Sequence, residues 1–330
     1  MESKLYNQKQ VENLKKAESQ NIPEKMNAIR LEQASGPAGL VYSQIETPTP
    51  KAGEVLVRVH AAAITRDELD WPVKRLPAIP SYEFSGVVAA LGEQVEDLTV
   101  GEQVYALSAF DRDGAAADYI IVRNEYLAPK PKTLTHIESA SIPLAALTAW
   151  QGLFEHGQLA KGQRVLIHGA TGGVGSFAVQ LACQQGAYVI GTVSSRNIAA
   201  ARELGVDEVI DHTTDRFEEL AGQVDLVFDT VGGDRLKRSP AIVHPGGRLI
   251  SVASEPDQEQ AAASGIQALY FVVTHNRKQL VEISKLVESG KLRPLIAEVF
   301  PLKDARQAFE HSQAAHKAGK IVLRIAGEQA

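Results

Sequence analysis

Three glycines in one short turn, Gly172, Gly173 and Gly175, could bind a phosphate group. Because they lack side chains, the backbone can come close to a pyrophosphate, and the N–H groups at the start of a following helix attract an anion. The pattern reads A-T-G-G-V-G, so Ala170 replaces the first glycine of the usual G-x-G-x-x-G motif. The residues expected to form this anion site are Thr171, Gly172, Gly173 and Val174.

The segments around the glycines predict a strand, a turn, a helix and a second strand. Residues 164–168 contain a continuous apolar run, which is typical of a strand buried in a parallel sheet. Apolar residues at helical spacing follow the turn, and Gly186 is expected to end that helix. The second strand covers 188–193. This context favours a dinucleotide-binding unit over the alternative, a glycine turn without a ligand.

The end of the second strand indicates which dinucleotide would bind. Enzymes that prefer NAD usually place an acidic residue there to bind the ribose hydroxyls. This chain instead has Ser194, Ser195 and Arg196, with no acidic residue before Glu203. Two hydroxyls and a guanidinium suit the 2′-phosphate of NADPH. The alternative is that Arg196 is a solvated residue at the start of the next helix.

Composition and charge exclude several other classes of protein. The 330 residues carry a net charge of −6 with a pI near 5.9, which argues against nucleic-acid or anionic-membrane partners. No apolar run of about 18 residues is present, so no membrane span is expected. The polar segment 1–25 lacks the apolar stretch of a secretory signal, so we expect a cytoplasmic protein. The single cysteine, Cys183, excludes an intrachain disulfide and a four-cysteine zinc site.

The pattern of apolar residues divides the chain into domains of the α/β class. Short alternating strands precede Pro143, and from there helices alternate with apolar strands, as in a doubly wound parallel sheet. An amphipathic helix is expected over 277–289, and barrel-like material returns after it. The domains expected are a polar extension at 1–25, a distorted β-barrel domain at 26–147 plus 292–330, and a cofactor-binding domain at 148–291.

Several spaced segments stand in the order that one family uses. They are GEVLVRVHAAAIT, GVVAALGEQVEDLTVGEQV, ADYIIV, IPLAALTAWQGLF, GQRVLIHGATGGVGSFAVQLA, VDLVFDTVGG and AGKIVLRI. Through them the chain resembles the zinc-free quinone oxidoreductase branch of the medium-chain dehydrogenase/reductase superfamily, over about residues 26 to 326. The resemblance implies a discontinuous GroES-like distorted β-barrel domain, a Rossmann domain with a doubly wound parallel sheet, NADPH as cofactor, and an active site in the cleft between the domains. It also leads us to expect a homodimer formed through an edge strand.

The chain departs from the zinc-dependent relatives at their metal ligands. Their Gly-His-Glu segment corresponds here to Ser81, Tyr82 and Glu83, and no cysteine precedes Cys183. We therefore expect no metal site, and hydride transfer to a carbon conjugated to a carbonyl, which needs no Lewis acid. The resemblance thus implies an NADPH-dependent, zinc-independent reductase of quinones or α,β-unsaturated carbonyls. The alternatives are an enoyl-thioester reductase and a non-catalytic NADPH-binding sensor or scaffold.

Tyr82 is the candidate hydrogen-bond donor to the substrate carbonyl. The alternative is a packed aromatic residue whose hydroxyl is bound to the backbone. Thr65, in AITRDELDW, is a second candidate, because it falls near the Asn-x-x-Asp segment of many family members. Trp71, Phe110 and Trp150 are expected to line an apolar pocket or to belong to the core. On the cofactor side the resemblance adds the residues His212, Val231, Phe271 and Val272.

Overall fold

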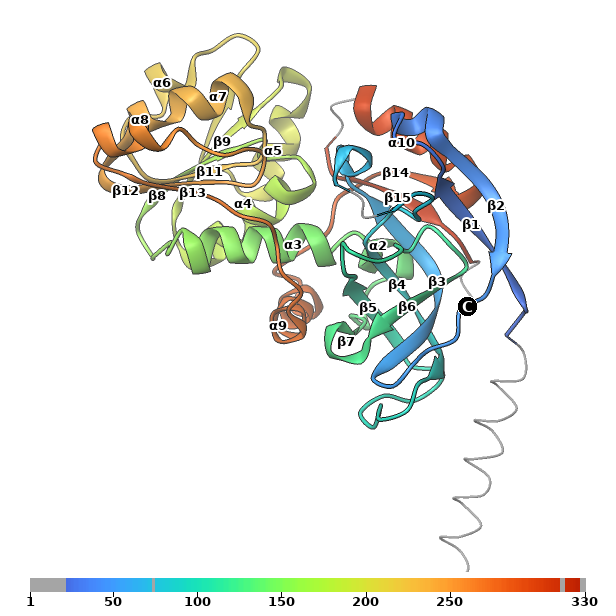
Figure 1. Ribbon diagram of the computed structural model, residues 1–330. Helices are drawn as coiled ribbons and strands as arrows, with labels where there is room; N and C mark the ends of the chain where they lie inside the picture. Colours follow the sequence, from blue (N-terminus) through green and yellow to red (C-terminus); the bar gives the residue numbers. More distant parts are fainter. Residues whose placement is uncertain (1–21, 73–74, 315–317, 327–330) are drawn as a thin grey trace, which may run out of the picture. The chain divides into compact units, whose positions relative to one another are not determined.

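The structure is a computed structural model that describes residues 22–72, 75–314 and 318–326 (Figure 1). Its contacts divide the described residues into two compact units: unit 1 contains residues 22–72, 75–140, 299–313 and 321–326, and unit 2 contains residues 141–298, 314 and 318–320. The divisions expected from the sequence lie at 147/148 and 291/292, within seven residues of these. The predicted extension 1–25 lies outside the described residues as far as residue 21, and Lys25 already begins a strand.

Unit 2 contains a six-stranded parallel sheet, in the order β10-β9-β8-β11-β12-β13. The order runs outward in both directions from β8, so the predicted doubly wound α/β sheet is confirmed. The strands are β8 (Arg164–His168), β9 (Tyr188–Val193), β10 (Glu208–Asp211), β11 (Val224–Asp229), β12 (Val243–Ser251) and β13 (Gln267–Tyr270).

Helices cover both faces of this sheet, which explains why its central strands are apolar throughout. Val165, Leu166 and Ile167 of β8 are fully buried. One face packs on α6 (Phe217–Leu220), α7 (Gly233–Arg238) and α8 (Gln258–Ala263), and the other on α3 (Pro143–Trp150), α4 (Gly173–Gln185) and α5 (Ile198–Leu204), as Figure 1 shows. A strand that is covered on both faces has no solvent side for polar residues.

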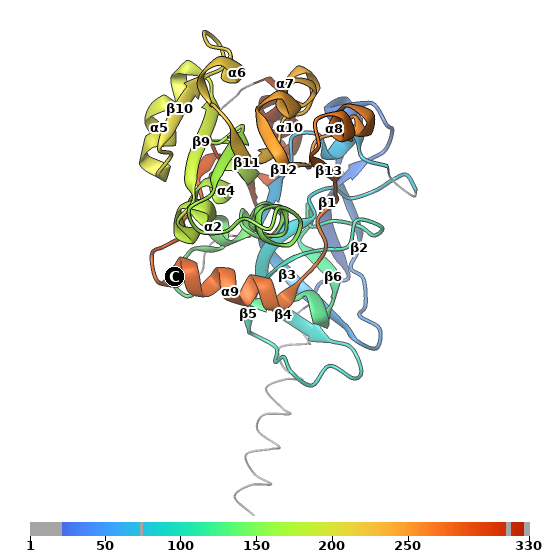
Figure 2. The same ribbon diagram turned by 90° about the vertical axis from the view of Figure 1, so that its left-hand side faces the viewer.

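Two helix boundaries of unit 2 agree with the sequence, and one further element was not predicted. The helix expected at 277–289 is α9 (Arg277–Glu288), which Figure 2 shows from the side. It begins where Asn276 Oδ1 accepts the N–H of Gln279 at 3.1 Å. Gly186 ends α4 with φ 78°, as predicted. The unexpected element is a π-helix (Gln151–His156) that continues directly from α3. Such wide turns occur often at functional sites.

Unit 1 is a curved β-sheet structure, in which the described strand pairings are antiparallel. Its larger sheet has the order β14-β15-β3-β4-β5-β7, with β6 also paired to β3. The strands are β1 (Lys25–Leu31), β2 (Leu40–Glu46), β3 (Glu54–Ile64), β4 (Glu83–Leu91), β5 (Gln103–Leu107), β6 (Tyr119–Arg123), β7 (Ala128–Pro129), β14 (Ile296–Pro301) and β15 (Lys320–Arg324), and the helices are α2 (His136–Ala140) and α10 (Ala305–Ala314). Because β15 pairs with β3, the predicted return of the last segment to the first sheet is confirmed.

Candidate functional site

The glycine turn leaves three N–H groups open for an anion. Strand β8 ends at His168 and α4 begins at Gly173. Among the described residues, the N–H groups of Gly173, Val174 and Gly175 have no hydrogen-bond acceptor. They lie in the first turn of a helix of 13 residues, where the helix dipole adds positive potential. The structure therefore fits the phosphate group that the sequence predicts here.

Close packing explains why Gly175 carries no side chain. A Cβ atom at Gly175 would lie 2.1 Å from the carbonyl oxygen of Gly169, which is backbone and has no room to move. Thr171 is buried, and Gly172, Gly173 and Val174 are half-buried, so the predicted loop residues surround the open N–H groups.

Lys320, which is far along the chain and was not predicted from the sequence, lies on this loop. Gly319 forms a parallel bridge with Gly172, and its N–H donates to the carbonyl of Thr171 at 2.9 Å. A Cβ atom at Gly173 would lie 2.6 Å from Cδ of Lys320, and Lys320 is only 6% exposed. An ammonium group is a common phosphate ligand. The segment AGKIVLRI contained this lysine, but no local pattern connects it with the glycines.

The ends of β9 and β10 bring four predicted residues together. Ser194 and Ser195 follow β9. His212 follows β10, the strand that pairs with β9 in the sheet. The N–H of His212 donates to the carbonyl of Val193 at 3.0 Å. Arg196 is exposed. Ser194 Oγ is buried and has no hydrogen-bond partner among the described residues, an arrangement that a ligand would correct.

Asp211 is an acidic residue beside this cluster that the sequence analysis did not identify. Thr213 donates to Asp211 Oδ1 through its N–H at 2.9 Å and through Oγ1 at 2.7 Å, and Thr213 Oγ1 lies 2.8 Å from Ser195 Oγ. Hydrogen bonding to the Asp211 carboxylate, first by the Ser195 side chain and then by the side chain and backbone of Thr213, lowers the pKa of Asp211. A carboxylate is thus held beside one of the two hydroxyls that were predicted to bind a 2′-phosphate.

The residues predicted near the nicotinamide also follow strands of the same parallel sheet. Val231 follows β11 and is 42% exposed, and Asp229 Oδ1 accepts its N–H at 3.2 Å. Phe271 and Val272 follow β13; Phe271 is buried, whereas Val272 is 57% exposed. Ligands of open α/β sheets bind at this carboxyl edge. The structure therefore places all the predicted cofactor residues at one edge of the sheet of unit 2.

In unit 1, Tyr82 is surrounded by aromatic rings. The ring centroid of Trp71 lies 6.1 Å from that of Tyr82, and that of Phe110 lies 5.2 Å away in an edge-on arrangement. Tyr82 is 5% exposed. Two of the three aromatic residues expected at a pocket therefore lie together here. The third, Trp150, instead packs on Phe154 within unit 2.

Glu68 organises the backbone around both candidate catalytic residues. Its Oε1 accepts the N–H of Ser81 at 2.9 Å, and its Oε2 accepts the N–H of Thr65 at 2.9 Å. The hydroxyl of Tyr82 has no hydrogen-bond partner among the described residues, in contrast to the alternative in which the backbone binds it. Burial, and then the charges of Glu68 and Asp113, raise the pKa of Tyr82 to about 12. Tyr82 is therefore a neutral donor at physiological pH.

Metal-binding side chains are not grouped in the part of the chain that the structure describes. No set of three or more His, Cys, Asp and Glu residues there could hold a metal ion. Tyr82, which the resemblance aligns with a metal ligand of zinc-dependent relatives, is not among the residue types that commonly bind zinc. Cys183 is half-buried, and burial raises the pKa of its thiol to about 11.

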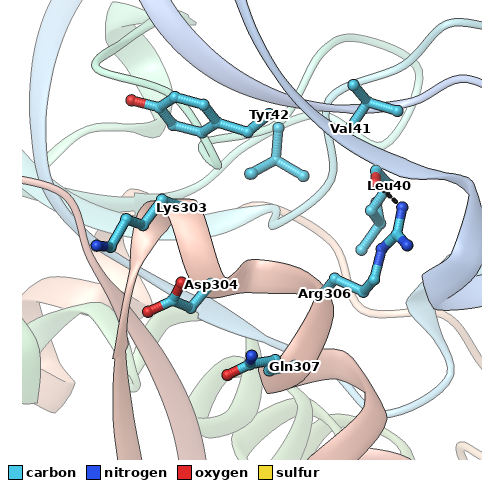
Figure 3. A pocket seen from close by; sticks show the side chains of 8 residues that line it. Leu40, Val41, Tyr42, Lys303, Asp304, Arg306 and Gln307 are labelled. Atoms are coloured by element: carbon cyan, nitrogen blue, oxygen red, sulfur yellow. Dashed lines mark hydrogen bonds between the residues drawn. The ribbon is translucent and has the colours of Figure 1, made fainter.

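A separate hollow lies on unit 1, between β2 and α10 (Figure 3). Its volume is about 360 Å³, and none of the residues predicted at the site belongs to it. Arg306 at its edge donates to the carbonyls of Ala38 and Leu40 at 3.1 and 2.7 Å, and so is engaged within the fold. Within the described ranges, the helices are too short or too polar to cross a membrane.

Known proteins match the chain over most of its length. The alcohol dehydrogenase GroES-like domain matches residues 51–132, and the zinc-binding dehydrogenase family matches residues 204–323. A probable mitochondrial zinc-binding oxidoreductase of Arthroderma benhamiae is 33% identical over 302 residues, which cover 84% of this chain and 91% of that protein. The chloroplastic NADPH-dependent alkenal/one oxidoreductase of Arabidopsis thaliana is 30% identical, with 92% of this chain and 80% of that protein covered.

The solved structures agree with these relatives. The quinone oxidoreductase from Coxiella burnetii superposes with a TM-score of 0.86 at 30% identity, covering 92% of this chain and 100% of that one. Fold and sequence thus lead to the same group of enzymes. The chain belongs to the quinone oxidoreductase branch of the medium-chain dehydrogenase/reductase superfamily, and it is an oxidoreductase that uses a nicotinamide cofactor.

Proposed function

We propose that the protein is an NADPH-dependent, zinc-independent reductase that transfers hydride to a quinone or to the conjugated C=C bond of an α,β-unsaturated carbonyl. The observation that carries the proposal is the free, neutral hydroxyl of Tyr82, in the segment where zinc-dependent relatives bind their metal. The names of two relatives, a quinone oxidoreductase and an alkenal/one oxidoreductase, support the same substrate classes.

NADPH is the cofactor that the residues of unit 2 suit best. The open N–H groups at α4 and the nearby Lys320 offer binding groups to a pyrophosphate. Ser194, with its unpartnered hydroxyl, and the exposed Arg196 offer binding groups to a 2′-phosphate. The negative charge of Asp211 repels that phosphate, whereas the positive charge of Arg196 attracts it. The preference for NADPH over NADH therefore depends on both residues.

The bound nicotinamide supplies hydride, and the residues of the chain provide orientation and hydrogen bonds. Hydride addition to a conjugated acceptor places negative charge on the carbonyl oxygen. Tyr82, with its O–H available, would donate to that oxygen and stabilise the charge without a metal. Trp71 and Phe110 shield Tyr82 from water and strengthen this bond. Glu68 holds the backbone that carries Tyr82 and Thr65.

The first test is the oxidation of NADPH, followed by absorbance, with a panel of acceptors. The panel contains a simple benzoquinone, a polycyclic ortho-quinone, an alkenal, an open-chain enone and an enoyl thioester, each repeated with NADH. Faster turnover with NADPH on a quinone or enone supports the proposal. Turnover of the thioester alone would show the alternative enoyl-thioester reductase. Binding of NADPH without any turnover would show the alternative sensor or scaffold.

We also propose a homodimer, formed through β13 as the edge strand of its sheet. Leu269 and Tyr270 on this strand are 40% and 39% exposed, and an apolar edge strand favours pairing with another strand. Light scattering after gel filtration would measure the mass in solution, and a monomer would contradict this proposal. The cytoplasmic location stays a prediction, because two of the matched relatives carry mitochondrial or chloroplastic names.

A further inference from the structure

One buried side-chain amide holds the segment that follows β13. Gln151, the first residue of the π-helix, is 2% exposed. Its Nε2 donates to the carbonyl of Thr274 at 2.9 Å, and its Oε1 accepts the N–H of Thr274 at 3.0 Å. The amide therefore binds both backbone groups of one residue, as a neighbouring strand would do.

A second amide fixes the orientation of the first. Nε2 of Gln151 also donates to Oε1 of Gln279 on α9, at 2.9 Å. Gln279 in turn donates through its Nε2 to Glu155, which belongs to the same π-helix as Gln151. Because only the NH₂ end of the Gln279 amide can donate to the carboxyl oxygen of Glu155, this bond fixes which way the amide of Gln279 faces. The chain of bonds thus determines which end of Gln151 donates to Thr274.

The π-helix supports both ends of the segment 271–274. At one end, the ring of Phe271 lies on His156 of the π-helix, with centroids 4.4 Å apart. At the other end, Gln151 binds Thr274. Between these two anchors Val272 is exposed, at the carboxyl edge of the sheet. An unanchored loop with so exposed a residue would be free to move.

We propose that Gln151 is a positioning residue, which sets the segment 271–274 against the nicotinamide half of bound NADPH. The inference rests on the proposed function, since Phe271 and Val272 are the residues expected near the nicotinamide. Gln151 itself does not contact the cofactor in this proposal. It acts through Thr274, and the π-helix serves to bring its amide to that residue.

The variant Gln151→Met tests the inference, because methionine has a similar length and cannot form these hydrogen bonds. It leaves the backbone groups of Thr274 and the amide of Gln279 without their partner. We expect hydrogen exchange of the segment 271–274 to become faster in the protein without cofactor. We also expect the Kd of NADPH to rise about tenfold, since the lost order must be recovered on binding. Adenosine 2′,5′-bisphosphate lacks the nicotinamide, so its Kd is expected to stay within about twofold of that of the wild type.

Gln180 provides a matched control within the same unit. It forms an equivalent pair of bonds: Nε2 donates to the carbonyl of Arg293 at 3.0 Å, and Oε1 accepts the N–H of Arg293 at 3.0 Å. Gln180 is 8% exposed, so its burial resembles that of Gln151. The variant Gln180→Met is expected to lower Tm as Gln151→Met does, without a faster exchange of residues 271–274. A merely structural role for Gln151 would make the two variants alike in NADPH binding.

A second variant covers the case in which Gln151→Met does not fold. Thr274→Pro removes the N–H that Oε1 accepts, and it changes an exposed residue. It is expected to weaken NADPH binding in the same selective way. An unchanged Kd of NADPH in a folded variant, or an equal loss of adenosine 2′,5′-bisphosphate binding, would overturn the inference. Failure of the wild-type protein to bind NADPH would instead overturn the proposed function.

Discussion

The carboxylate of Glu68 accepts the backbone N–H of Ser81 at 2.9 Å, and it thereby fixes the residue that precedes Tyr82. Ser81 has φ 68°, in the left-handed region that a serine rarely adopts. A buried carboxylate bound to a strained turn is therefore what holds Tyr82 in place. The strain lies directly beside the residue to which we assign the chemistry, as is common at functional sites.

Replacing Tyr82 with phenylalanine should reduce turnover and leave the fold intact. The hydroxyl has no partner among the described residues, so its removal breaks no bond within the fold. We expect kcat to fall about 10²-fold, because one donor to the developing oxyanion is lost, while the KM of NADPH stays unchanged. Steady-state kinetics and Tm measure the two effects. The control is Tyr119→Phe, which changes another buried tyrosine of unit 1; equal kinetics for the two variants would contradict the role of Tyr82.

Arg196 and Asp211 should change the cofactor preference in opposite directions. Arg196→Ala removes a cation from the proposed 2′-phosphate site, and we expect kcat/KM for NADPH to fall about tenfold while that for NADH is unchanged. Asp211→Asn removes a negative charge and should raise the preference for NADPH. The exposed Arg202 on α5 provides the control Arg202→Ala. The assignment fails if Arg196→Ala weakens both cofactors equally.

Two glycine substitutions should separate folding from cofactor binding. In Gly175→Ala the new Cβ would collide with the carbonyl of Gly169, so we expect both Tm and NADPH binding to fall. In Gly173→Ala the contact is with the side chain of Lys320, which can move aside. This variant should fold normally and bind NADPH less tightly, because Lys320 is displaced. Calorimetry and a binding titration measure both properties; normal binding by Gly173→Ala would argue against a role for Lys320.

Acid should destabilise unit 1 through His136. Burial, and then the charges of His60 and Lys130, lower the pKa of His136 from 6.5 to about 3. Between these values the unfolded chain binds the proton and the folded chain does not. The folded state therefore keeps its full stability with respect to His136 above pH 6.5, and it loses stability as the pH falls from 6.5 toward 3. Through this one group, the free energy of unfolding changes by at most about 1.4 kcal/mol per pH unit.

Denaturant unfolding at several pH values would measure this effect. His136→Gln should make the free energy of unfolding less dependent on pH in the acid range. The control is His244→Gln. The hydrogen bond with Asp225 raises the pKa of His244, so this histidine makes the folded state less stable as the pH rises, the opposite of His136. An unchanged acid slope in His136→Gln would contradict the assignment.

Removal of divalent metal should leave the activity unchanged. The segment of the zinc ligands contains Tyr82, and no group of suitable side chains occurs in the described ranges. We expect dialysis against a chelator to preserve kcat for a quinone or enone acceptor. Elemental analysis of the dialysed protein confirms that metal is absent. Activity that is lost on dialysis and restored by zinc would contradict the proposal.

Local sequence signals predicted the elements of unit 2 because each depends on neighbouring residues. The apolar run at 164–168 and the glycine at 186 gave a strand and a helix end that the structure confirms. A strand buried on both faces must be apolar, and a left-handed helix end favours glycine. The same reasoning gave the helix that begins at residue 277.

Distant contacts account for the residues that the sequence did not reveal. Lys320 reaches the glycine loop only because Gly319 pairs with Gly172. Asp211 approaches Ser195 because β10 lies beside β9. Gln151 binds Thr274 because a π-helix turns its side chain toward that residue. None of these pairings follows from a periodicity, since each joins segments that are separated along the chain.

The bridge between Gly172 and Gly319 also makes the phosphate loop dependent on the last part of the chain. A polypeptide that stops before Gly319 would lack the N–H that binds Thr171 and the lysine that packs on Gly173. A dinucleotide cassette cut from residues 164–196 and grafted onto another scaffold would lack them as well. The loop is therefore completed only after residues 319 and 320 have been synthesised, so a nascent chain that stops short of them cannot form it in full.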